Sequence, residues 1–81
     1  MSVDSPTPQE VADALRGVLP RNTAVYHVEL VAATDGCVAR ARIGVTRRTQ
    51  VEISGLGGTI QTAIVDMYSR VREHVAKEPN P

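Results

Sequence analysis

Aromatic residues are almost absent from this chain: among its 81 residues there is no Phe, no Trp and only two Tyr. The core must therefore be built from Val, Ile, Leu and Ala, each of which buries less area than an aromatic side chain does. A chain this short buries only about 60% of the surface that its unfolded form exposes. We expect one thin-cored domain over residues 1–81, ordered at about 7–77, with frayed tails at 1–5 and 78–81.

Cysteine is equally scarce, because Cys37 stands alone. A single cysteine excludes an internal disulfide and a clustered-thiol metal site, and we interpret it as a small half-buried hydrophobic residue. His27 and His74 have no carboxylate or thiol companion at ligand spacing, so we predict no metal and no cofactor. No set of residues combines a nucleophile, a base and an oxyanion site, so we predict no catalytic residues and no enzymatic activity.

Net charge and long apolar runs are also missing. Nine basic and nine acidic residues cancel, so no overall field draws the chain to nucleic acid or to an anionic membrane. No apolar run approaches the roughly 20 residues that span a bilayer, and the first residues lack the features of a signal peptide. We therefore expect a cytoplasmic protein without membrane contact. Eight of the nine basic residues are Arg, which is typical of a GC-rich genome and favours an actinobacterial or phage origin.

Two stretches have helical periodicity. Thr7, Pro8 and Glu10 predict a helix start, since Thr7 can cap, Pro8 fits the first helical position and Glu10 can complete a capping box. A second helix is expected over residues 59–77. Its apolar positions recur at spacings of three and four residues, and they are Ile60, Ala63, Ile64, Met67, Val71 and Val75.

Between the helices the period changes to two, which indicates strands. Residues 33–36 have turn chemistry and join two alternating stretches into a hairpin. The register that follows sets inward residues opposite one another, pairing Tyr26 with Ile43, Val28 with Ala41 and Leu30 with Ala39. It also sets Glu29 opposite Arg40 and Val31 opposite Val38, the first being a favourable charge pair.

A third strand is expected over residues 50–54, with Val51 and Ile53 facing inward. A two-residue turn at Arg47 and Arg48 would put this strand out of phase, so we expect a three-residue loop or a bulge near Gly44. The whole pattern predicts an α+β fold in the order helix, three-stranded antiparallel meander, helix, with both helices on one face of the sheet.

The other face of that sheet is left for water or for a partner. Two open sheet edges and several exposed apolar side chains predict a small protein-interaction module that forms a homodimer or binds another protein. The candidate interface residues are Val25, Val31, Val38, Val65 and Tyr68.

Nucleic-acid binding is an alternative, because four cations fall within nine residues that include no acid. These cations are Arg40, Arg42, Arg47 and Arg48. They can form a solvated surface balanced by Glu29 and Glu52, or they can contact phosphates. No aromatic residue lies among them to stack a base, which counts against recognition of single strands.

A glycine-rich segment precedes the second helix. Gly55, Gly57 and Gly58 can form a turn that needs glycine dihedrals, or they can act with Thr59 to present backbone N–H groups to an anion or a small ligand. No Lys-Ser or Lys-Thr follows the glycines, and the preceding strand belongs to an antiparallel meander. Phosphate-loop and dinucleotide motifs are therefore excluded.

Over about residues 7–77 this order of elements resembles the double-stranded-RNA-binding domain, in which a glycine-containing turn also precedes the last helix. That family holds RNA with a polar residue of the first helix, a loop His and a lysine cluster that opens the last helix. Gln9 or Asp13 matches the first of these. The loop at 33–36 has no His, and residues 59–63 keep Ala63 but no lysine, so the resemblance implies the fold without the RNA site, as in domains that act in protein interaction or dimerisation.

From Val38 to about Val75 the chain also resembles one half of the regulatory domain of 2-isopropylmalate synthases. The matching features are the alternation Ala-Arg-Ala-Arg-Ile, the glycine-rich segment and the helix after it. This resemblance implies a small-ligand regulatory domain. Since only one half is present, a leucine-type effector site would need a dimer or a partner chain.

Overall fold

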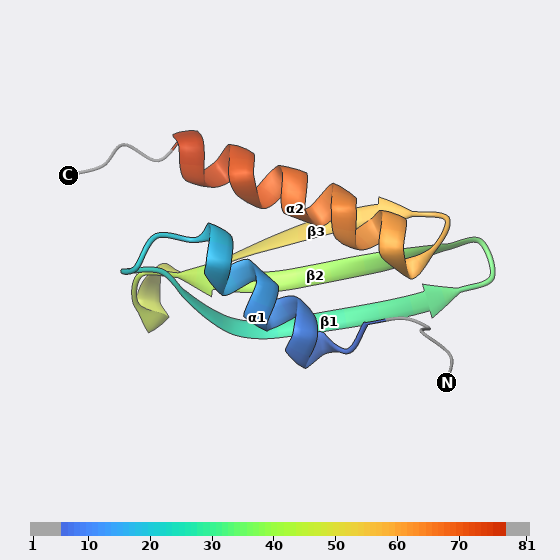
Figure 1. Ribbon diagram of the computed structural model, residues 1–81, viewed down its shortest axis with the longest axis horizontal. Coiled ribbons are helices and arrows are strands. Elements are labelled where there is room, and N and C mark those ends of the chain that lie inside the picture. Colours follow the sequence, from blue (N-terminus) through green and yellow to red (C-terminus); the bar gives the residue numbers. More distant parts are fainter. Residues whose placement is uncertain (1–5, 78–81) are drawn as a thin grey trace.

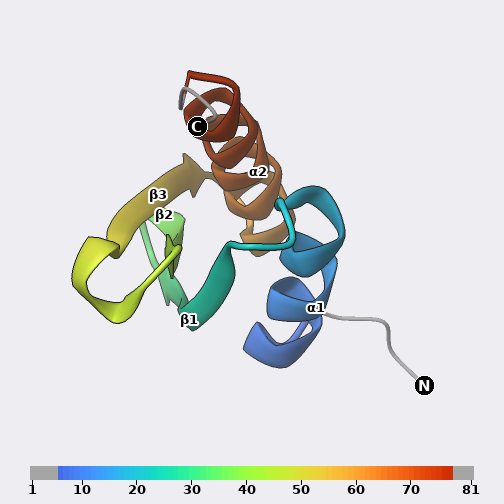
Figure 2. The ribbon, with the colours of Figure 1, turned by 90° about the vertical axis from the view of Figure 1, so that its left-hand side faces the viewer.

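The computed structural model describes residues 6–77, and the expected tails at 1–5 and 78–81 lie outside the described residues. The order of elements is α1 (Pro8–Val18), β1 (Ala24–Ala33), β2 (Gly36–Gly44), the 3-10 helix η1 (Arg47–Thr49), β3 (Val51–Gly57) and α2 (Ile60–Lys77). The three strands form an antiparallel sheet with β2 in the middle. Both helices cover the same side of it (Figure 1, Figure 2), so the predicted α+β fold is confirmed.

The start of α1 is fixed by the predicted capping box. The N–H of Glu10 donates to Oγ1 of Thr7 at 3.2 Å, and the N–H of Thr7 donates to Oε1 of Glu10 at 2.8 Å. Pro8 occupies the first turn, where its missing N–H costs nothing. The helix then buries Val11 and Leu15 against the sheet.

The core lies between the sheet and the two helices. Its floor is the inward face of β2, where Ala39, Ala41 and Ile43 are almost completely buried. The two alanines let α2 approach the central strand, while α1 packs mainly on β1. The largest fully buried side chains are all aliphatic, as the composition requires, and they are Leu15, Ile43, Met67, Val11 and Val71.

The hairpin has the predicted register from Val28 to Ala32, which stand opposite Ala41 and Cys37 respectively. At the start of β1 the prediction is wrong, because a β-bulge at Tyr26 shifts the pairing and puts Val25 opposite Ile43. Val25 consequently packs against the core, while Tyr26 is 36% exposed. A bulge increases the local twist, and β1 curves at this end (Figure 1).

The third strand keeps the predicted phase, since Val51 and Ile53 stand opposite the buried Ile43 and Ala41. The connection between β2 and β3 sets which side chains of β3 face inward. It spans residues 45–50 and includes η1, so it is longer than the predicted three-residue loop or bulge. The loop is stabilised by Thr46, whose N–H donates to Oγ1 of Thr49 at 2.9 Å and whose Oγ1 accepts from the N–H of Arg48 at 3.2 Å.

The glycine-rich segment is where the structure differs most from the prediction. Gly55 and Gly57 are extended residues of β3, and within residues 6–77 only Gly36 has a positive φ. The prediction of a glycine turn is therefore wrong for these two positions. They face α2, and a Cβ on Gly55 would overlap the backbone of Met67 and Ala63. The glycines thus allow the first turns of α2 to lie directly on β3.

Candidate interaction surface

The sheet surface that faces away from both helices, called here the outer face, is left uncovered (Figure 2). Pairing of the three strands arranges its side chains in three cross-strand rows. These rows are Val31, Val38 and Leu56; Glu29, Arg40 and Ser54; and His27, Arg42 and Glu52. One row is apolar and two are polar or charged.

The apolar row crosses all three strands. Leu56 is 65% exposed and Val31 is 37% exposed, whereas Val38 between them is half-buried. Sequence reasoning named Val31 and Val38 but missed Leu56. The signal was the period of two in the glycine segment, which puts Leu56 on the face opposite Gly55 and Gly57 once this segment is recognised as a strand.

The other predicted interface residues lie elsewhere. Val25 and Tyr68 pack against the core, and partial burial raises the pKa of the Tyr68 hydroxyl. Val65 is 62% exposed, but it belongs to α2, on the other side of the sheet. Of the five candidates, only Val31 and Val38 come together on one surface.

The four arginines form two groups. Arg40 and Arg42 lie on the outer face in the middle of β2, while Arg47 and Arg48 belong to η1. Figure 2 shows the yellow-green η1 segment projecting from the sheet on the side away from the helices.

Acidic side chains offset part of this positive charge on β2. Nη1 of Arg40 lies 3.4 Å from Oε1 of Glu29, as the register predicted, and Arg42 stands opposite Glu52 on the neighbouring strand.

The turn before α2 consists of Gly58 and Thr59. The N–H of Thr62 donates to Oγ1 of Thr59 at 3.1 Å, and the N–H of Thr59 donates to Oγ1 of Thr62 at 3.0 Å. This reciprocal cap satisfies two of the backbone donors that an anion would otherwise use. Anion or ligand contact by Gly55, Gly57, Gly58 and Thr59 stays a prediction.

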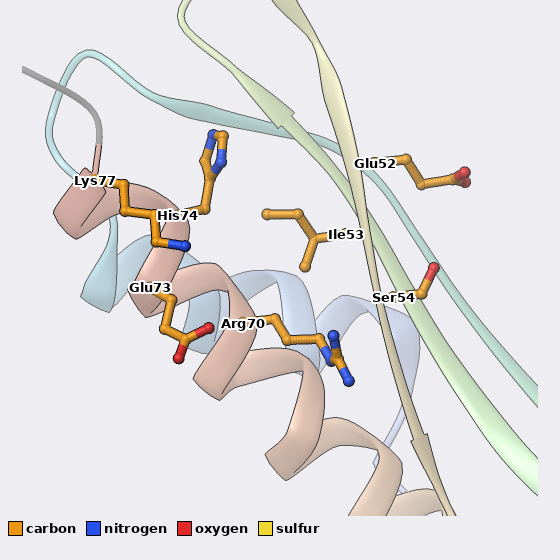
Figure 3. A pocket seen from close by; sticks show the side chains of 7 residues that line it. All are labelled: Glu52, Ile53, Ser54, Arg70, Glu73, His74 and Lys77. Carbon is orange, nitrogen blue, oxygen red and sulfur yellow. The ribbon is translucent and has the colours of Figure 1, made fainter.

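A groove opens between the C-terminal half of α2 and β3 (Figure 3). The glycines hold the helix close to β3 at one end, and toward the start of β3 the helix and the strand diverge (Figure 1), where Ile53 packs against the core. The groove has a volume of about 440 Å³ and is lined by Glu52, Ile53, Ser54, Arg70, Glu73, His74 and Lys77. Sequence reasoning did not predict it.

Asp66 joins α2 to β3 through a hydrogen bond. Its Oδ2 accepts a hydrogen bond from the backbone N–H of Leu56 at 2.9 Å and another from Nε of Arg70 at 3.1 Å. The hydrogen bond from Leu56, and after it the hydrogen bond and the positive charge of Arg70, lower the pKa of the Asp66 carboxyl. Both hydrogen bonds favour the charged form of the Asp66 carboxyl.

No protein family, no curated protein and no solved structure matches this chain. The α-β-β-β-α order is compatible with the topology of the double-stranded-RNA-binding domain. Neither described helix is both long and apolar enough to cross a membrane. Within residues 6–77, no three His, Cys, Asp or Glu side chains are grouped closely enough to hold a metal ion.

Proposed function

We propose that this protein is a small interaction module that pairs with a second copy of itself through the outer face. The observation that carries the proposal is the apolar row of Val31, Val38 and Leu56 on a sheet surface that no helix covers. An uncovered sheet face of an α+β domain is normally polar. Leu56, next to the last residue of β3, is 65% exposed in the monomer, and a facing apolar surface would bury it.

The charges of the outer face support a second copy as the partner. Beside the apolar row the face carries two acids, Glu29 and Glu52, and two arginines, Arg40 and Arg42. A face with equal numbers of both signs can supply an opposite charge to each charge of an identical face. The chain has no net charge, so two copies also approach without long-range repulsion.

Sedimentation velocity over a range of micromolar concentrations tests this proposal. The native protein is expected to shift from monomer to dimer as concentration rises, and Leu56→Lys is expected to stay monomeric because it would bury an unpaired ammonium group in the interface. The matched control is Val65→Lys, since Val65 is about equally exposed but lies on α2.

Circular dichroism should show that both variants keep the fold. A native protein that stays monomeric at every concentration would overturn the proposal. So would a Val65→Lys variant that loses dimerisation as completely as Leu56→Lys does, because the interface would then be on the helices.

Duplex nucleic-acid binding is a second candidate, favoured by one observation: Arg40 and Arg42 share the outer face, and η1 with Arg48 projects on the same side. Its test is titration with duplex RNA and duplex DNA at two salt concentrations, because phosphate contacts strengthen as salt falls. The same variants separate the two functions. Leu56→Lys is expected to abolish dimerisation but to maintain or strengthen RNA binding, whereas Arg42→Glu should weaken RNA binding.

A further inference from the structure

The free edge of β3 is the edge that does not pair with β2. Part of it is hydrogen-bonded to α2, and the rest is not covered by the helix. The N–H of Leu56 donates to Asp66 of α2 and therefore points away from β2, toward the free edge. Backbone groups of alternate residues in a strand point the same way. The N–H and C=O groups of Ser54 and Glu52 thus also point to the free edge.

The uncovered part of this edge runs along the groove. Asp66 covers the edge at Leu56, but beyond that point α2 diverges from β3, and Glu52, Ile53 and Ser54 line the gap (Figure 3). An exposed row of edge donors and acceptors is a template for another strand. Here the template is short, about three residues, and it has a wall of helical side chains beside it.

We propose that this edge binds an extended segment of another protein as a fourth strand, with an acidic side chain of that segment entering the groove against α2. The site uses backbone groups of the β3 edge and side chains of α2, and not the apolar row of the outer face. The segment would gain main-chain hydrogen bonds from β3 and its specificity from the groove.

The register of such a strand determines which side chain enters the groove. A residue opposite Ile53 points to the same side of the sheet as Ile53, which Figure 3 shows directed toward α2. Its neighbours in the segment point to the outer face, as Glu52 and Ser54 do in the same view. One side chain of the segment is therefore placed between Ile53 and the helix.

The charges around that position favour an acid. Arg70 and Lys77 contribute cations from α2, His74 lies between them, and Arg70 extends toward the strand (Figure 3). Arg70 gives its Nε to Asp66, but a guanidinium group has five N–H donors in all. Of the two lining acids, Glu52 points away from the helix toward the outer face, and the carboxylate of Glu73 is turned away from Ile53 (Figure 3).

These same charges disfavour a second copy as the added strand. Pairing β3 with β3 of another copy would bring two α2 helices side by side, each with the cations Arg70 and Lys77 at the groove. Like charges facing one another weaken an interface and select against that partner. A different chain with an acidic side chain removes this conflict.

Fluorescence anisotropy with labelled synthetic peptides tests the inference. The probes are peptides of about eight β-branched residues with a central Glu, Gln or Lys. We expect the Glu peptide to bind about tenfold more tightly than the Gln peptide, as a hydrogen bond to a charged group allows. The Lys peptide should not bind.

Three variants locate the binding. Arg70→Gln and Lys77→Gln should reduce the preference for Glu over Gln, whereas Arg72→Gln, at an exposed position of the same helix, should leave it unchanged. Ser54→Pro removes an edge N–H that β2 does not use and should abolish binding of every peptide, while Ser54→Ala should not. Leu56→Lys should bind the Glu peptide normally, which separates this site from the proposed dimer.

The backbone amides give a readout that does not depend on how the variants fold. In nitrogen-edited NMR spectra, the Glu peptide should shift the amide signals of Glu52 and Ser54. Equal affinity for the Glu and Gln peptides would overturn the inference, as would shifts centred on Val31 and Val38.

Discussion

Gly55 of β3 lies so close to Met67 of α2 that no side chain fits between them: a Cβ at position 55 would overlap the backbone of the helix. Gly57 has the same relationship to Thr62 and Ala63, one turn earlier. The two glycines therefore set the distance between helix and strand. Because Ile53 follows on the same face of β3, the helix diverges there, and the groove beside the free edge results.

Gly55→Ala is expected to destabilise the fold by about 3 kcal/mol, because the overlapping atoms belong to the backbone and cannot rotate away. The matched control is Gly58→Ala. Space around Gly58 is open and its φ is not positive, so the substitution should be neutral or should stabilise by about 0.5 kcal/mol. Urea unfolding of both variants measures the difference, and equal stabilities would contradict this account of the helix–strand contact.

The sequence predicted those parts of the fold that depend on interactions between residues close together in the chain. The capping box of Thr7 and Glu10 depends on residues three apart, and the hairpin from Val28 to Ala41 depends on turn length and alternation. The bulge at Tyr26 could not be predicted in this way. Val25 and Tyr26 are both apolar, so either residue can face the core, and only packing against the rest of the fold chooses Val25.

The candidate sites were harder to predict than the fold. The pair of Glu29 and Arg40 followed from the register, but Leu56 was missed because its glycine neighbours indicated a turn. Those glycines serve a contact with α2, which is distant in the sequence and leaves no local signal. The groove depends on the angle between α2 and β3, and that angle follows from packing at Gly55 and Ile53 together.

Asp66 should make stability depend on pH. Its folded pKa lies below the ordinary value of 3.8, so its charged form contributes stability that is fully present above that value and is lost as pH falls through the lower folded pKa. Asp66→Asn is therefore expected to lower the free energy of unfolding at about pH 7, and the difference from the native protein should shrink as pH falls below 3.8. Urea unfolding at a series of pH values measures this. A stability difference that does not change as pH falls would mean that the carboxylate charge is not responsible.

Cys37 should be protected by the fold. Its side chain is 8% exposed and lies under the turn at Gly58, with Sγ 4.0 Å from the carbonyl oxygen of that residue. A thiol reagent such as dithionitrobenzoate needs access to the thiolate, so it should react at least about a hundredfold more slowly with the native protein than with the protein in urea. Stopped-flow absorbance measures both rates. Equal rates in the two conditions would show that the sulfur is open to solvent.

Met67 should contribute more to stability than any exposed residue of α2. It is completely buried and lies over the glycines of β3, so Met67→Ala leaves a cavity that the adjoining backbone of Gly55 cannot fill. We expect a loss of about 3 kcal/mol in the free energy of unfolding. Val65→Ala on the exposed side of the same helix should change stability by less than about 0.5 kcal/mol. Urea unfolding at a concentration where the protein is monomeric keeps any dimer contribution out of the comparison, and similar losses for the two variants would mean that α2 does not pack on β3 through Met67.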